Sequence, residues 1–188
     1  MSTFSNTLLA LGGLVLLLCV GCSASAGITV TNAPSLGFES PYMGATVRGD
    51  LDGERWIGRA EGSYLWAHKI ETGDGHAVSG DALGGAKFWA HPKWNLGALA
   101  GYRYNKNWTS RWDKSSAQYL AELQLRFHGG NVGATYSRET DTSGWYGYGL
   151  RAEANAGKHV RIVTAWEHLL FDDYSSGDHV KLSALWRF

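Results

Sequence analysis

Cysteine is nearly absent from this chain of 188 residues: it has two, Cys19 and Cys22, and both lie close to the N-terminus. If a leader ending at residue 26 is removed, the mature chain keeps no thiol. That would exclude a disulfide framework, a cysteine metal site and a cysteine nucleophile. An excess of either charge is also absent, with 17 Lys and Arg against 17 Asp and Glu. Nucleic acid is therefore not an expected partner.

Long apolar runs are missing as well. The longest covers residues 8–20, which is too short to cross a bilayer as a helix. Small residues follow, and Ala24-Ser25-Ala26 matches a signal-peptidase site. We therefore expect residues 1–26 to be a signal peptide and 27–188 to be the mature protein. A lipoprotein leader, with an acylated Cys22 as the first residue, is the alternative.

The chain is rich in glycine (25), tryptophan (9) and tyrosine (9), and its pattern beyond residue 27 has a period of two. Between Trp56 and Trp66, apolar or small residues occupy one set of alternate positions, while charged residues such as Arg59 occupy the other. Alternate side chains of a strand point to opposite faces. The pattern predicts an all-β fold whose strands have one apolar and one polar face.

Three features favour a closed antiparallel transmembrane β-barrel over a soluble sandwich. Aromatic residues border the apolar faces, and ten strand steps from Trp56 to Trp66 rise about 25 Å when tilted, the height of an outer-membrane apolar band. The polar faces carry both signs of charge, which a dry sandwich core would not tolerate. Short turns alternate with longer polar links at 68–81, 106–116, 140–144 and 171–178.

The C-terminal segment 182–188 alternates apolar residues and ends in Phe188. It is similar to the terminal strand recognised by the barrel-assembly machinery, and the mature chain resembles small bacterial outer-membrane barrels of the OmpA/OmpX type. The resemblance is to an architecture, with no single family matched. It implies lipid and lipopolysaccharide as surroundings, periplasmic N- and C-termini and extracellular long loops.

Eight strands are clear from the pattern, and 41–51 alternates as a ninth. Since such barrels have even strand numbers, 28–39 is expected to supply a tenth, although Pro34 weakens it. We favour ten strands, with eight as the alternative.

A barrel of this size is filled largely by its own side chains. The expected lumen residues are Arg59, Glu61, Arg103, Glu122, Arg126, Arg151, Glu153, Arg161, Glu167, Lys181 and Arg187.

Aromatic residues on the outward positions are expected to form a girdle where the barrel meets the lipid headgroups. They are Trp56, Trp66, Trp94, Tyr102, Tyr104, Tyr119, Phe127, Tyr146, Tyr148, Trp166, Trp186 and Phe188.

The function expected from these features is structural or surface recognition, through the extracellular loops. Trp108, Arg111 and Trp112 would contact an unknown ligand. A narrow ion or solute channel is one alternative.

An outer-rim hydrolase, either omptin-like or lipid-modifying, is the other alternative. Its candidate residues are Asp172, Asp173, His179 and His168, although no omptin motif is matched. No cofactor or metal site is expected.

Overall fold

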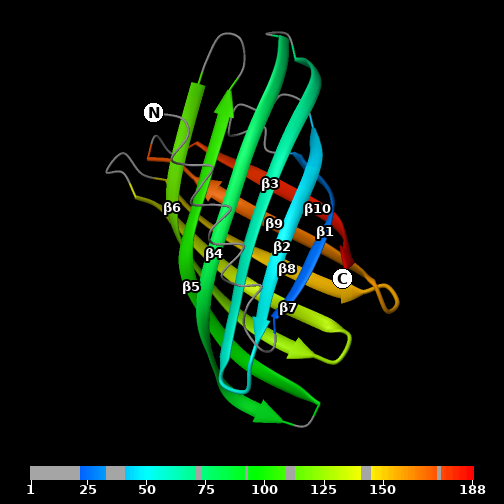
Figure 1. Cartoon of the computed structure of the whole chain (residues 1–188). Helices are drawn as coiled ribbons and strands as arrows, with labels where there is room; N and C mark the ends of the chain where they lie inside the picture. The colour runs from blue at the N-terminus through cyan, green and yellow to red at the C-terminus, as the bar shows by residue number, and fades with distance from the viewer. Residues whose placement is uncertain are drawn as a thin grey trace.

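The computed structural model describes residues 22–32, 41–70, 73–91, 93–108, 113–140, 145–172 and 175–188. These residues form ten antiparallel strands that close into one barrel (Figure 1). The strands are β1 Cys22–Asn32, β2 Tyr42–Asp52, β3 Trp56–Ile70, β4 Gly73–His91, β5 Trp94–Trp108, β6 Asp113–Phe127, β7 Gly130–Glu139, β8 Tyr146–Asn155, β9 Val160–Leu170 and β10 Ser176–Arg187. The prediction of a closed antiparallel barrel with ten strands is confirmed.

Each strand pairs with the next along the chain, and β1 closes the ring against β10, with Ile28 opposite Ala184. Closure gives every strand two partners, so the barrel has no free sheet edge. Within the part of the chain that the structure describes, no helix has the length and apolar character needed to cross a membrane.

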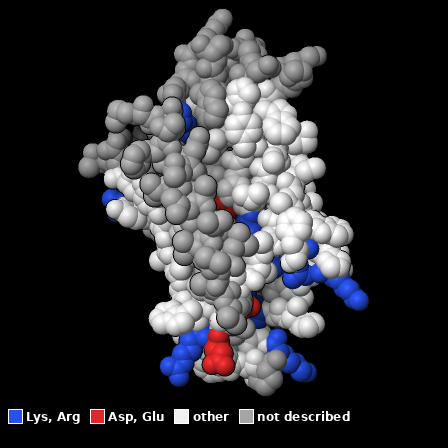
Figure 2. All heavy atoms as spheres, in the orientation of Figure 1, with Lys and Arg blue, Asp and Glu red and all other residues white. Residues whose placement is uncertain are grey.

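The outer surface of the barrel is apolar and widely exposed. Ile28, Val47 and Leu150 are each about 60% exposed. White, uncharged atoms cover most of the described flank in Figure 2. A soluble monomer rarely exposes a continuous apolar surface of this size. The exterior is therefore the surface of a membrane-embedded barrel, which is the architecture of small bacterial outer-membrane barrels.

Strands β3 to β6 are longer than the others. They have 15 to 19 residues, whereas β7 to β10 have 10 to 12. The extra length carries them beyond their neighbours at the upper end of the barrel in Figure 1. We call this the long-strand end, and the end with the short links 53–55, 92–93, 128–129 and 156–159 the turn end.

Two predicted long loops are largely strand, which corrects the expectation. Within 68–81, β3 runs to Ile70 and β4 begins at Gly73; within 106–116, β5 runs to Trp108 and β6 begins at Asp113. Backbone pairing continues through both segments, with Lys106 opposite Ser115. Where strands extend past the apolar belt, neither face needs to be apolar, so the alternation that marks a membrane strand is lost.

The first strand also lies earlier than expected, at Cys22–Asn32 instead of 28–39. Its Ile28 and Val30 face outward as the alternation predicted, whereas residues 33–40 lie outside the described part of the chain. Cys22 to Ala26, which the sequence placed in the leader, pair with β2 from Leu51 to Val47.

The turn end is built from tight connections. In the β8–β9 turn, Gly157 has a φ of 95°, a backbone conformation that favours glycine. The β4–β5 hairpin has an irregular register between Lys87 and Trp89, and the Trp89 and Trp94 rings stack with centroids 6.2 Å apart.

Inside the barrel, apolar side chains share the space with charged ones. One buried cluster contains Tyr42, Leu65, Ala67 and Ala77, and a second contains Ile57, Leu83, Leu99 and Leu120. The lumen is therefore filled in part by an ordinary apolar core, which the expected polar interior did not include.

Candidate functional site: the lumen and the outer rim

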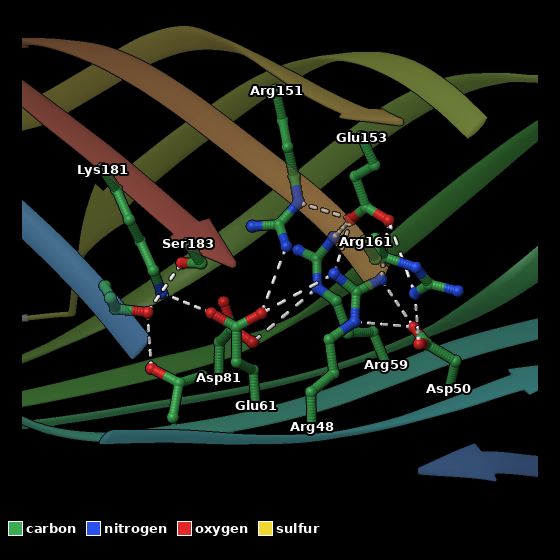
Figure 3. Close-up of polar contacts among 12 residues, drawn as sticks. Arg48, Asp50, Arg59, Glu61, Asp81, Arg151, Glu153, Arg161, Lys181 and Ser183 are labelled. Atoms are coloured by element: carbon green, nitrogen blue, oxygen red, sulfur yellow. Dashed lines mark hydrogen bonds and ion pairs between the residues drawn. The ribbon is translucent and has the colours of Figure 1, made fainter. Parts of the chain in front are cut away.

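The lumen contains a network of ion pairs between opposite walls of the barrel (Figure 3). Its members occupy alternate positions of their strands, so they share the inward face. The network is centred on two glutamates, Glu153 of β8 and Glu61 of β3. Both are almost fully buried.

Glu153 accepts hydrogen bonds from side chains on three strands. Arg48 Nη1 and Nη2 of β2 donate to its two oxygens at 2.7 and 3.0 Å. Arg151 Nε donates at 2.9 Å and Asn131 Nδ2 at 3.0 Å. Arg161 Nη1 lies 3.6 Å away. A carboxylate with this many donors remains charged although it is buried.

Glu61 makes a second centre beside the first. Lys181 of β10 contacts one of its oxygens, and Arg151 Nη2 of β8 donates to the other at 3.2 Å. Arg48 Nη1 is 3.7 Å from the same carboxylate. Arg48 and Arg151 therefore join the two glutamates, and the pairs cross the lumen from wall to wall.

Further ion pairs extend the network in both directions. Arg59 donates to Glu122 at 2.8 Å, and Arg161 to Asp50 at 2.6 Å. Toward the long-strand end, Arg103 donates to Glu167 at 2.9 Å, and Ser137 also donates to Glu167.

At the turn end, Arg126 donates to Asp52 at 3.0 and 3.1 Å. Arg187 donates to the Lys158 carbonyl oxygen at 3.3 Å. Each residue of the expected lumen set is thus found on the inward face of its strand.

A chain of hydroxyl groups lines the adjoining wall. Thr29 lies 2.6 Å from Thr46 and 2.7 Å from Ser183, and Thr46 lies 2.7 Å from Ser63, measured between hydroxyl oxygens. The four residues connect β3, β2, β1 and β10 on the inside. Hydroxyls both donate and accept, so a row of them satisfies itself without water.

Sequence reasoning missed four charged members of the network, which are Arg48, Asp50, Asp52 and Asp81. Arg48 and Asp50 are two residues apart in β2, so they share one face of the strand. Two opposite charges on one face could have indicated that both residues point into the lumen. Asp81 was assigned to a loop, whereas it lies in β4, 3.8 Å from Arg59 and 3.9 Å from Arg103.

The rim residues proposed for hydrolysis do not form one site. His168 faces outward, and its Nδ1 lies 3.0 Å from Asp178 Oδ1, which also accepts from Trp166 Nε1 at 3.0 Å. His179 faces inward and lies 2.7 Å from the Thr31 hydroxyl. Asp172 is exposed, and Asp173 lies outside the described residues.

The predicted girdle residues from Trp56 to Trp186 lie on the outward positions of their strands, and Phe188 follows the end of β10 and is exposed. Trp56 is 66% exposed and Trp66 is 44% exposed, at opposite ends of the β3 outer face. Neighbouring girdle rings meet edge to face, as do Tyr102 with Tyr119 and Tyr148 with Trp166. Trp145 differs from them because it is buried inside the barrel.

Of the predicted recognition residues, Arg111 and Trp112 lie outside the described part of the chain. Trp108 ends β5, and its backbone pairs with Asp113. Among the described residues, no group of three or more His, Cys, Asp or Glu side chains is arranged to hold a metal ion.

No protein-family model matches the chain, and no curated protein sequence matches it. Several solved structures do. The translocator domain of the autotransporter NalP from Neisseria meningitidis is 12% identical with a TM-score of 0.47, covering 98% of this chain and 95% of that one. Ail, the attachment invasion locus protein of Yersinia pestis, is 16% identical with a TM-score of 0.37, covering 89% and 97%. Outer membrane phospholipase A from Escherichia coli is 10% identical with a TM-score of 0.42, covering 87% and 95%.

Proposed function

We propose that the chain is a non-conducting barrel of the bacterial outer membrane that acts as a scaffold for a recognition surface at its long-strand end. The single observation that carries this proposal is the wall-to-wall ion pairing of Arg48 with Glu153 and of Arg151 and Lys181 with Glu61. These bridges block the middle of the lumen. A conducting path needs continuous water and binding sites that an ion can leave.

The packing around the bridges supports the same conclusion. Leu99 and Leu120 are each less than 5% exposed and fill the lumen beside the charged network. The paired carboxylates and guanidiniums hold one another tightly, and moving one of them aside would leave a buried, unpaired charge. Spontaneous opening of the barrel to ions is therefore expected to be costly.

Conductance in planar bilayers tests the closed lumen. The refolded protein is expected to give no current steps above the leak of the lipid alone. A double variant that removes both centres, Glu61→Ala with Glu153→Ala, is expected to open a water path and give anion-selective steps. Reproducible steps from the unaltered protein would overturn the proposal and favour a channel.

The proposed orientation places the turn end in the periplasm. The start of β1 and the end of β10 both lie at that end, with Cys22 opposite Leu51 and Ser25 opposite Arg187. Short periplasmic turns and longer outer loops are the usual arrangement of outer-membrane barrels. Protease added to whole cells is expected to cut near residues 109–112 and to spare the turns, and cleavage confined to 156–159 would reverse the orientation.

We further propose that residues 1–26 are removed on export and that the barrel-assembly machinery inserts the chain through β10 and Phe188. The intact mass of the exported protein tests the leader: the expected N-terminus is Gly27. Retention of Cys22 with an added lipid mass would instead identify a lipoprotein. Deletion of Phe188 is expected to lower the amount of barrel in the membrane without changing its synthesis.

The recognition surface would be formed by the extended strands β3 to β6 with the connection at 109–112, which contains Arg111 and Trp112. Tryptophan and arginine are residue types enriched in binding hot spots. Cells carrying the protein are expected to bind lipopolysaccharide or a host-cell surface more strongly than cells carrying a variant with 109–112 replaced by Gly and Ser. Equal binding at equal surface abundance would remove this segment from the proposal.

A further inference from the structure

The turn end of the lumen contains a cavity of about 230 Å³. Three carboxylates line it, against five guanidinium groups from β2, β3, β6, β9 and β10. The lining therefore has an excess of two positive charges. The five arginines are Arg48, Arg59, Arg126, Arg161 and Arg187.

The carboxylates are already fully engaged. Asp50 accepts from Arg48 at 2.6 and 2.8 Å and from Arg161 at 2.6 Å. Glu153 is occupied by Arg48, Arg151 and Asn131. Asp52, at the mouth of the cavity, lies 2.7 Å from Lys87 Nζ as well as pairing with Arg126.

Donors on two of the arginines are left over. Arg59 is 97% buried, yet its Nη1 makes no hydrogen bond and lies 3.9 Å from the nearest Glu153 oxygen. The buried Nε of Arg187 also has no acceptor. Within the described residues, the Arg187 guanidinium makes no ion pair, and its Nη2 donates to the Lys158 carbonyl oxygen at 3.3 Å. Buried, unsatisfied donors on charged groups are costly and rare.

We propose that this cavity binds a small oxyanion of the phosphate or sulfate class. Such an ion supplies the missing acceptors, and its charge matches the excess on the lining. Planar guanidinium groups bind tetrahedral oxyanions through paired N–H donors, which favours this class over chloride. The cavity is large enough to hold the ion together with bound water.

The ion would enter from the turn end. Asp52 and Arg126 at the mouth are 51% and 20% exposed, whereas the far side of the cavity is closed by Arg48 with Glu153 and by Arg59 with Glu122. The cavity is therefore a pocket in the lumen that opens only at the turn end, and it does not continue as a channel through the barrel. A lipid headgroup is excluded because its acyl chains would have to lie inside the lumen, and the proposed ligand is a free ion.

The experiment is calorimetric titration of the chain from Cys22 to Phe188, which keeps the β1 residue Ser23 that lines the cavity, folded in a maltoside detergent, with inorganic phosphate. Ionic strength is held constant by exchange against sodium gluconate, whose singly charged carboxylate is not a tetrahedral oxyanion. A saturable heat with one site per barrel is expected. Sulfate is expected to bind within about tenfold of phosphate, and chloride more weakly than either.

Arg187→Gln is the decisive variant, because loss of the Arg187 guanidinium leaves no carboxylate of the described residues without its partner. It is expected to weaken phosphate binding at least tenfold. Arg55→Gln is the matched control, because Arg55 is exposed at the same end and does not line the cavity. It is expected to change binding less than twofold.

Phosphate giving no saturable heat to the folded protein would overturn the proposal. So would equal affinities of the Arg187→Gln and Arg55→Gln variants. If Arg187→Gln does not fold, Arg126→Gln replaces it, because Arg126 pairs with the half-exposed Asp52 at the mouth and carries little of the fold. The same tenfold loss is expected, and affinity equal to the control would again reject the site.

Discussion

The lumen is filled in two different ways, by an apolar part and by a charged part, which we call its apolar half and its charged half. Beside β3 to β6, the buried cluster of Ile57, Leu83, Leu99 and Leu120 packs like the core of a soluble protein. Elsewhere in the lumen, charged groups centred on Glu61 of β3 and Glu153 of β8 and a row of hydroxyls fill the space. The apolar half depends on shape and tolerates small changes locally. The charged half depends on complete pairing, so the loss of one member affects several partners at once.

The largest effect is expected from Glu153→Ala, which breaks the charged half. The variant leaves Arg48, Arg151 and Arg161 short of a buried acceptor. The free energy of unfolding is expected to fall by about 3–5 kcal/mol. Urea unfolding in detergent, followed by tryptophan fluorescence, measures the change. Glu54→Ala, at an exposed turn position, is the control and is expected to change stability by less than about 0.5 kcal/mol; similar losses in the two variants would contradict the role of the network.

Leu120→Ala makes the matching change in the apolar half. Leu120 is 2% exposed and packs among the leucines of β4 and β5. Loss of burial together with the cavity that remains is expected to cost about 2–5 kcal/mol. The same urea titration measures it. Leu120→Met should recover most of the loss because it conserves volume, and a Met variant as weak as the Ala variant would argue against packing as the cause.

Leu150→Arg tests the outer surface, and its effect on stability can be compared with those of the two changes in the lumen. Leu150 is 61% exposed on the outward face of β8, where the barrel meets lipid. A cation placed there is expected to cost about 2–4 kcal/mol near the bilayer midplane. Folding into phospholipid vesicles measures this cost, and Tyr146→Arg, nearer the rim, is expected to cost about 0–1 kcal/mol. Equal costs at the two positions would place the apolar belt elsewhere.

The smallest effect is expected from Asp52→Asn. This carboxylate pairs with Lys87 and Arg126 but is half exposed at the turn rim. Exposed pairs contribute little, so a loss of about 0–1 kcal/mol is expected, decreasing further in salt. Unfolding at low and high sodium chloride measures it. A loss as large as that of Glu153→Ala would mean that the rim and the interior of the lumen do not differ in the way proposed.

Much of the architecture could be predicted from alternation alone. A period of two reports which face of a strand meets lipid, so the positions of Arg59, Glu122 and Trp56 followed from their parity. The ten-strand barrel followed from counting such segments. The prediction failed at the strand ends, where 68–81 and 106–116 read as loops because both of their faces are polar. Those segments are strands because their backbones pair with a neighbouring strand. The pattern of residues within one segment does not reveal such pairing.

The candidate site was predicted only as a list of inward-facing residues. Alternation places Arg48 on the polar face of its strand. It does not show that Arg48 contacts Glu153, which lies 105 residues further along the sequence. It also did not show that His168 and His179 face opposite sides of the wall with different partners. Those relations depend on the register of pairing around the ring.

The sequence by itself determined that this chain forms strands with one apolar and one charged face, because side-chain alternation is a property of each strand alone. Only the tertiary structure decided which charges meet, which arginine donors remain unpaired and where the lumen is closed. Closing ten strands into a ring brings residues from distant segments within hydrogen-bond distance, and that distance depends on the stagger of every strand pair together.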